Sequence, residues 1–265
     1  MNIETIGLLY FSPTQTTKKI VEGIAQGIQA TNMQYFDLTL PEAIPQTCLE
    51  VIQDVAIIGS PVYAGRLPSV MLARFKQMKG NGRPAVIVVV YGNRAYEDAL
   101  IELRDIAIEV GFRPIAAGAF IGEHSYSTSD LPLAEGRPDA DDMLTAQNFG
   151  KSTRKKIMTE ISNPIELLQV PGNSPYKEIQ MLSGIVPSVN DALCSKCEKC
   201  VLVCPTAAID KENPINTAKD LCIRCCACIK ACPSNAKSLD DPRIMQAAEW
   251  LYANFSARKE PEIYL

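Results

Sequence analysis

Residues 194–233 read CSKCEKCVLVCPTAAIDKENPINTAKDLCIRCCACIKACP, and the rest of the chain is organised around this stretch. It holds one pattern twice, in which three cysteines stand three residues apart and a fourth follows four residues later, just before a proline. The two copies are Cys194, Cys197, Cys200, Cys204 and Cys222, Cys225, Cys228, Cys232. Each position recurs 28 residues later, which predicts two similar loops in one small domain.

This spacing is typical of two 4Fe-4S clusters, because three thiolates of one loop bind one cluster and the fourth turns toward the other. The predicted ligand sets are Cys194, Cys197, Cys200, Cys232 and Cys222, Cys225, Cys228, Cys204. Zinc is the alternative, but a tetrahedral zinc site takes two close pairs and does not use a third cysteine at the same spacing. A disulfide framework is disfavoured, because we find no signal peptide and expect a reducing cytosol.

Two further cysteines lie outside the repeated pattern. Cys226 is next to a predicted ligand, and Cys48 lies far upstream. We expect both to be free, buried side chains that behave as small hydrophobic residues.

The composition limits the partners of this chain of 265 residues. The net charge is −4, and from residue 185 onward ten basic residues balance ten acidic ones, so no basic surface for nucleic acid is expected. The longest apolar run, Ala85–Tyr91, is far shorter than the roughly 20 residues of a membrane span. We expect a cytoplasmic protein without a membrane span, because clusters of this kind are sensitive to oxygen.

Residues 1–165 are predicted to form an α/β domain, a flavodoxin-like doubly wound sheet of five parallel strands covered by helices. A linker of residues 166–184 follows, and residues 185–265 are predicted to form a small α+β ferredoxin-like domain with a C-terminal helix. The expected strands are short apolar runs separated by longer amphipathic ones. They are Thr5–Phe11, Gln34–Leu38, Asp54–Gly59, Pro84–Tyr91 and Pro114–Ile121.

The first predicted strand leads directly into a loop rich in hydroxyl groups and then into a helix. The loop is expected to hold a terminal phosphate with its hydroxyls and with the free amides of the helix start. Its predicted binding residues are Ser12, Thr14, Gln15, Thr16 and Thr17. A simple helix cap is the alternative, but this loop lies at the carboxyl edge of the sheet, where ligands bind. The motif of a P-loop is absent, and so is the glycine motif of a nicotinamide site.

Two further loops leave the same edge of the sheet. Each offers a glycine for close backbone approach and a tyrosine that could stack on a flat ring. Taken singly, Tyr63 or Tyr96 is better explained by ordinary packing, but with the phosphate loop the set predicts an FMN site. The residues expected to contact FMN are Pro61, Val62, Tyr63, Ala64, Gly65, Tyr91, Gly92, Asn93, Arg94, Tyr96 and Glu97.

These loops, the stretch Gly122–Ser125 and the two cysteine patterns together resemble the flavodoxin-ferredoxin fusion family, often labelled EFR-type ferredoxins. The resemblance covers nearly the whole chain and implies an FMN-binding flavodoxin-like domain fused to a two-cluster ferredoxin. Flavodoxin phosphate loops usually carry glycine where Gln15 stands. We therefore expect glutamine to adopt a backbone conformation that glycine adopts easily.

His124, the single histidine, lies on the loop after the last predicted strand. Its ordinary pKa is near neutrality, so it is a candidate catalytic residue that protonates the flavin or orients a substrate. A structural role in the loop is the alternative. The polar stretch Ser125–Asp130 that follows is a candidate lid over the flavin.

The leading functional prediction is electron transfer between two 4Fe-4S clusters and one FMN, and on to an external redox protein or small-molecule donor or acceptor. A second hypothesis is an FMN reductase of a small organic substrate that the clusters supply with electrons. In a third, the large domain binds no flavin and only docks a partner. The sequence leaves open whether two chains pair.

Overall fold

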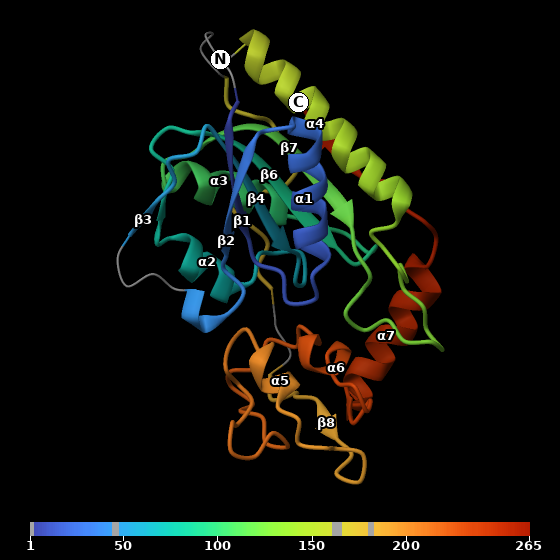
Figure 1. The fold of residues 1–265 in the computed structure, drawn as a ribbon. Helices are drawn as coiled ribbons and strands as arrows, with labels where there is room; N and C mark the ends of the chain where they lie inside the picture. The colour runs from blue at the N-terminus through green and yellow to red at the C-terminus, as the bar shows by residue number, and fades with distance from the viewer. Residues whose placement is uncertain (1–2, 44–47, 161–165, 180–182) are drawn as a thin grey trace.

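The computed structural model describes residues 3–43, 48–160, 166–179 and 183–265 (Figure 1). The end of the first predicted domain at residue 165 and part of the predicted linker, residues 180–182, lie outside this description. In Figure 1 the sheet and its helices occupy the upper part of the molecule. The stretch with the repeated cysteines, residues 194–233, which we call the cysteine-rich segment, lies below them.

The large sheet has six strands in the order β10-β7-β6-β4-β1-β2. Its parallel strands are β1 (Thr5–Tyr10), β2 (Asn32–Asp37), β4 (Val55–Pro61), β6 (Pro84–Tyr91) and β7 (Arg113–Ile121). The prediction of five parallel strands is confirmed, with limits that differ by two residues at most. The chain begins with β1, continues to β2 at the edge of the sheet, and then crosses to the other side of β1 for β4, β6 and β7. This strand order is flavodoxin-like.

The sixth strand, β10 (Glu262–Tyr264), was not predicted. It pairs antiparallel with β7, where Ile263 lies opposite Gly118. The chain therefore returns to the sheet after the cysteine-rich segment, and the sheet has an antiparallel edge strand in addition to the predicted five.

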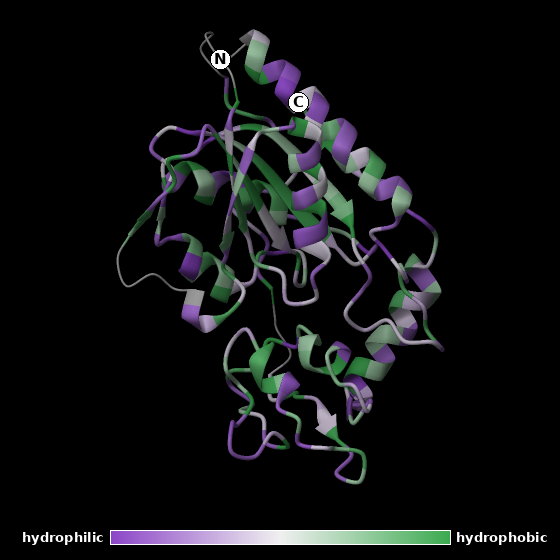
Figure 2. Cartoon of the chain, viewed as in Figure 1, coloured by the Kyte–Doolittle hydropathy of each residue, from purple (hydrophilic) through white to green (hydrophobic). Residues whose placement is uncertain are grey.

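Helices cover both faces of the sheet. On one face lie α1 (Thr16–Ile28) and α4 (Ala140–Glu160), and on the other lie α2 (Ser69–Phe75) and α3 (Ala99–Glu109). Ile20, Ile24 and Ile28 are fully buried, as the helical period predicts. Figure 2 shows the result as hydrophobic strands between helices whose outer faces are hydrophilic.

Two short pairings complete the description of the strands. β3 (Leu49–Glu50) pairs with β5 (Met78–Lys79), and β8 (Ser188–Val189) pairs with β9 (Lys237–Ser238). A 3-10 turn covers Pro41–Ala43.

The cysteine-rich segment repeats its backbone as well as its sequence. Its short helices, α5 (Lys199–Leu202) and α6 (Ala227–Lys230), begin 28 residues apart. The residue before each helix, Glu198 or Cys226, has the same left-handed φ of 61°. This equivalence explains the position of Cys226, which takes the place of Glu198 in the second copy of the turn.

The segment after α4 lies along α3 rather than free in solvent. The Asp98 carboxylate accepts hydrogen bonds from the backbone of Asn173 at 2.8 Å and of Lys177 at 2.7 Å. Leu168 is buried in the core beneath α3. The predicted linker thus packs on the sheet domain over its described residues.

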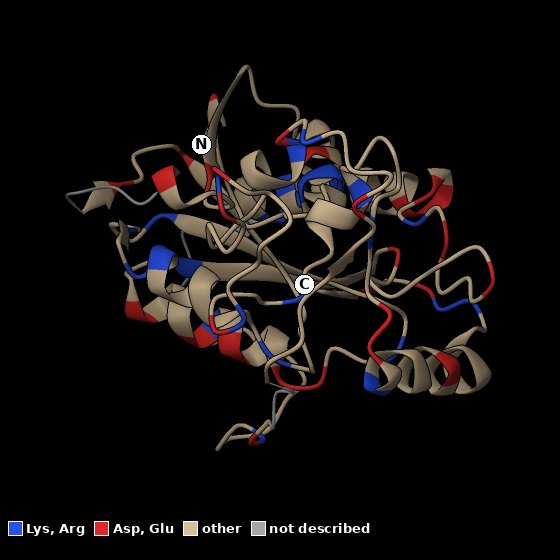
Figure 3. Cartoon of the chain, turned by 90° about the horizontal axis from the view of Figure 1, so that it is seen from below, with Lys and Arg blue, Asp and Glu red and all other residues tan. Residues whose placement is uncertain are grey.

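The predicted C-terminal helix is α7 (Pro242–Phe255), and at its start the Asp241 side chain accepts a hydrogen bond from the Arg243 backbone. Ile244, Ala248 and Leu251 of this helix are buried, whereas Tyr252 is exposed. No helix among the described residues is long and apolar enough to cross a membrane. Figure 3 shows acidic and basic residues interspersed over the molecule.

Candidate functional site

The eight repeated cysteines line two small hollows, and each hollow takes four of them. One hollow is lined by Cys194, Cys197, Cys200 and Cys232, and the other by Cys204, Cys222, Cys225 and Cys228. The grouping matches the predicted ligand sets, including the exchange of the fourth cysteine between loops. Four thiolates around one hollow are the donor set that a 4Fe-4S cluster requires. We call the first hollow the distal hollow and the second the proximal hollow.

The two exchanged cysteines have equivalent surroundings. The Cys204 sulfur accepts a hydrogen bond from the Ala208 amide at 3.3 Å, and the Cys232 sulfur accepts one from the Ala236 amide at 3.2 Å. Hydrogen bonds to sulfur are among the factors that set the reduction potential of such clusters. The two exchanged cysteines therefore receive the same kind of backbone hydrogen bond at sulfur.

The two cysteines outside the pattern differ in exposure. Cys226 is buried, as predicted, and it also lines the proximal hollow with the four repeated cysteines. Cys48 is exposed on the surface ahead of β3, so the prediction that it is buried is wrong.

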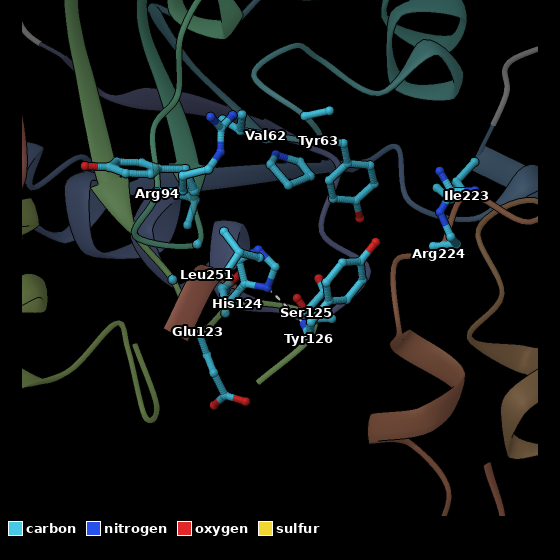
Figure 4. A pocket seen from close by; sticks show the side chains of 18 residues that line it. Val62, Tyr63, Arg94, Glu123, His124, Ser125, Tyr126, Ile223, Arg224 and Leu251 are labelled. Atoms are coloured by element: carbon cyan, nitrogen blue, oxygen red, sulfur yellow. Dashed lines mark hydrogen bonds between the residues drawn. The ribbon is translucent and has the colours of Figure 1, made fainter. Parts of the chain in front are cut away.

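A cavity of about 310 Å³ lies at the carboxyl edge of the sheet (Figure 4). Residues from all three predicted loops line it, together with the single histidine. These predicted residues are Thr14, Thr16, Pro61, Val62, Tyr63, Ala64, Tyr91, Gly92, Arg94 and His124. The edge predicted to bind a ligand therefore carries a cavity lined by the expected side chains.

The phosphate loop has the backbone predicted for it. Gln15 adopts a left-handed conformation with φ of 66°, which a glycine would adopt with less strain. Its amide side chain donates to the Ser12 carbonyl at 3.1 Å, and the Ser12 hydroxyl accepts from the Lys18 amide at 3.0 Å. These contacts stabilise the loop internally, so Ser12 and Gln15 shape it rather than line the cavity.

Thr17 lies at the start of α1, next to the cavity-lining Thr16 but outside the lining itself, with only 1% of its surface exposed. Its hydroxyl has no hydrogen-bond partner among the residues that the structure describes. Buried hydroxyls are normally hydrogen-bonded, so an anion at this helix start would satisfy it. The loop therefore fits a phosphate group.

Four other residues predicted to contact FMN lie outside the cavity lining. The Tyr96 hydroxyl hydrogen-bonds to Glu262 at 2.7 Å, and the Asn93 amide donates to the carbonyl of Phe255 at 2.6 Å. Glu97 forms an ion pair with Arg94 at 2.6 Å, and Gly65 lies against the Glu97 side chain. Their polar groups hold the C-terminal segment and the loop itself, so they support the cavity from outside.

Four cavity residues were not predicted from the sequence. They are Val90, Ile223, Arg224 and Leu251. The last three come from the cysteine-rich segment and α7, and Ile223 and Arg224 also line the proximal hollow. For Ile223 and Arg224 the only signal in the sequence was their position between Cys222 and Cys225. Their place in the cavity wall depends on where that cysteine loop packs, which the sequence does not show.

Two tyrosines lie between the cavity and the proximal hollow. Figure 4 shows the hydroxyls of Tyr63 and Tyr126 directed toward one another inside the cavity. Burial raises the pKa of both phenols, and the charge of Cys226 contributes to each shift. Both rings are therefore close to the second cysteine loop as well as to the cavity.

His124 is fixed inside the cavity by its own loop. Its Nδ1 accepts a hydrogen bond from the Tyr126 amide at 3.0 Å, and the two rings meet edge to face at 5.1 Å. Burial, with the charges of Arg94 and Lys230, lowers the pKa of His124 from 6.5 to about 4. The imidazole is therefore neutral at pH 7.

We expect this lowered pKa to be visible in the apoprotein by NMR, where a single histidine gives a single Hε1 signal. The signal should titrate with a midpoint near 4. Between pH 6.5 and about 4, His124 is protonated in the unfolded chain but not in the folded chain. The free energy of unfolding should therefore fall as the pH drops from 6.5 toward 4. His124→Asn should remove this pH dependence, and a midpoint at or above 6.5 would contradict the prediction.

Comparisons with known proteins agree with this division of the chain. Residues 187–240 match the family model described as a 4Fe-4S dicluster domain. The chain thus combines a flavodoxin-like sheet with a 4Fe-4S domain in one polypeptide. One curated relative is a pyruvate-flavodoxin oxidoreductase from Nostoc sp. (strain PCC 7120), 26% identical over 155 residues. This match covers 55% of the chain but only 12% of that relative.

Similar solved structures include several flavodoxins. Flavodoxin 1 from Bacillus cereus is 16% identical, with a TM-score of 0.42, over 57% of this chain and 98% of that one. The Fusobacterium nucleatum flavodoxin bound to flavin mononucleotide is 19% identical, with a TM-score of 0.39, and the match covers 58% of this chain and 98% of the flavodoxin. The assignment of the fold rests on the strand order described above.

Proposed function

We propose that this chain is an iron–sulfur flavoprotein that transfers electrons between two 4Fe-4S clusters and one FMN, and on to an external redox partner. The observation that carries the proposal is the pair Ile223 and Arg224, which line both the cavity and the proximal hollow. A flavin in the cavity and a cluster in the hollow would then be separated by a single layer of residues. The name of the Nostoc relative, an oxidoreductase, supports a redox role.

In this proposal each group of residues has one task. The two sets of four cysteines bind the clusters. Residues 1–165 form the flavin domain, residues 166–184 form the linker, and residues 185–265 form the cluster domain, except that β10 at their end belongs to the sheet of the flavin domain. Thr14, Thr16 and Thr17 hold the phosphate, while Tyr63 and Tyr91 contact the ring. When bound, FMN exchanges two electrons, and each cluster exchanges one at a time.

The order of the centres follows from exposure. The distal hollow has one exposed cysteine, Cys197, and one buried, Cys200, whereas the four predicted ligands of the proximal hollow include two buried cysteines and no exposed one. An external partner would therefore exchange electrons with the distal cluster, and the proximal cluster would connect it to the flavin. Because such clusters need a reducing compartment, we infer a cytoplasmic location.

The second candidate function, an FMN reductase, is favoured by His124 and Arg94 in the cavity wall. A histidine with a pKa of about 4 is almost fully deprotonated at pH 7, so it would rarely carry the proton that a general acid donates to a substrate. This argument favours the carrier over the reductase.

Stopped-flow mixing of the anaerobically reduced protein distinguishes the two functions. A carrier should pass electrons to an added ferredoxin or flavodoxin without any small substrate, at a rate that depends on ionic strength. A reductase should hold its electrons until a small oxidant arrives, and His124→Ala should slow that oxidation by roughly a hundredfold or more. Oxidation that requires a substrate and is lost in His124→Ala would refute the carrier.

Iron, sulfide and flavin counts on anaerobically purified protein test the cofactors themselves. We expect about eight irons and one flavin per chain, as two 4Fe-4S clusters and one FMN require. Full iron with no uptake of FMN would instead support a large domain that only docks a partner.

A further inference from the structure

Arg74 is a charged residue on α2 that lies almost entirely inside the protein, with 3% of its surface exposed. Arginine is rarely buried without a partner, because removing its charge from water is costly. Its surroundings therefore indicate what the buried guanidinium does.

The guanidinium joins the sheet domain to the cysteine-rich segment. Nη1 donates to the carbonyls of Leu38 at 2.8 Å and Thr39 at 2.6 Å, just after β2. Nη2 donates to the carbonyl of Pro205 at 2.5 Å, and Pro205 directly follows Cys204. One planar group thus holds the loop after β2 against the residue next to a predicted ligand of the proximal cluster.

The same contacts reach the phosphate loop. The Thr39 hydroxyl accepts a hydrogen bond from the Ser12 amide at 2.9 Å. The guanidinium carbon of Arg74 also lies 5.9 Å from the centre of the Phe11 ring, one residue before Ser12. A continuous series of contacts therefore runs from the phosphate loop through Thr39 and Arg74 to Pro205.

The charge of Arg74 has no ion-pair partner among the described residues of the sheet domain, and only the more distant carboxylates of Glu42 and Asp37 act on it. Its acceptors are backbone carbonyls, and no carboxylate in the described part of the chain forms an ion pair with it. Burial lowers its pKa while Glu42 and Asp37 raise it, and an arginine in a protein keeps its proton. A cluster with four thiolate ligands would bring negative charge next to Pro205.

We propose that Arg74 is a positioning residue that clamps the Cys204 loop to the phosphate loop and supplies the buried positive charge beside the proximal cluster. The inference rests on the proposed function for the cluster, whereas the clamp itself involves only residues of this chain. The planar fork of arginine suits this task, because its two ends donate in different directions and a lysine ammonium cannot span both sides.

The test compares Arg74→Gln and Arg74→Lys with a matched control, Arg154→Gln. Arg154 also donates to two carbonyls, those of Ile28 at 2.5 Å and Gln29 at 3.0 Å, at the end of α1 away from the phosphate loop. Hydrogen exchange at residues 204–208 measures the clamp, with or without clusters. The reduction potentials of the clusters, followed by EPR, measure the charge.

Arg74→Gln should speed exchange at residues 204–208 by at least about tenfold, as expected for loss of a charge-assisted hydrogen bond. It should also shift the proximal potential to a more negative value and leave the distal one unchanged. Arg74→Lys should speed exchange while keeping the potential closer to that of the native protein. Arg154→Gln should change neither.

Unchanged exchange and unchanged potential in Arg74→Gln would overturn the inference. If that variant does not fold, unchanged exchange in Arg74→Lys overturns it instead. A native protein that binds no clusters would refute the proposed function and with it the role of the charge, and the exchange result would still decide whether Arg74 is the clamp.

Discussion

Cys204→Ser is expected to destroy the cluster held by the second cysteine loop while the cluster of its own loop persists. Cys204 faces the proximal hollow with Cys222, Cys225 and Cys228, whereas Cys232 completes the distal set. Loss of one thiolate from a set of four should remove most of that cluster. Iron per chain should fall to about half, and EPR should show the remaining reduced cluster.

Cys197→Ser and Cys226→Ala provide the matched comparison. Cys197→Ser should damage the distal cluster only, because Cys197 lines that hollow. Cys226→Ala should retain full iron, although Cys226 is buried beside Cys225. Iron loss in Cys226→Ala as severe as in Cys204→Ser would show that the ligand sets are wrong.

Thr17→Val should have opposite effects on the apoprotein and on FMN binding. The valine removes a buried hydroxyl without a partner among the described residues, so the free energy of unfolding of the apoprotein should rise by up to about 1 kcal/mol. The phosphate loses a donor, so FMN affinity should fall by a factor of about ten to a hundred or more, or roughly 1.5 to 3 kcal/mol. Thermal unfolding and flavin fluorescence measure the two quantities.

Thr153→Val is the control for this pair of effects. Thr153 on α4 is also fully buried with an unpartnered hydroxyl in the described part of the chain, but it lies next to Arg154, which contacts the end of α1 away from the phosphate loop. It should stabilise the apoprotein similarly and leave FMN affinity unchanged. Equal FMN affinity in Thr17→Val and the native chain would contradict a phosphate at this helix start.

The parallel strands could be predicted because burial on both faces demands continuous apolar runs. β6 is buried along its whole length and has the limits that its sequence predicts. The grouping of the cysteines was equally predictable, because a spacing of three residues fixes which thiolates share a loop. Both signals are local, so they do not depend on how distant segments meet.

Features that depend on distant contacts could not be predicted. β10 has only three residues, one of them charged, and it becomes a strand because it pairs with β7. Tyr96 carries the same local signal as Tyr63, yet its hydroxyl contacts Glu262 and Tyr264, which lie far along the chain. Arg74 likewise appears as an ordinary charged residue of a helix until Pro205 lies against it.

Because β10 returns to β7, the cysteine-rich segment is anchored to the sheet at both of its ends. Before the segment, Asn173 and Lys177 hold the chain at the start of α3. After it, residues 256–261 lead from α7 to β10, so the segment is connected to the sheet domain twice. Two short tethers restrict its excursions far more than one flexible linker would and keep its local concentration at the cavity high. In the proposed function the clusters and the flavin would belong to one chain and stay close together, so electron exchange between them should proceed at a rate that does not change when the protein is diluted.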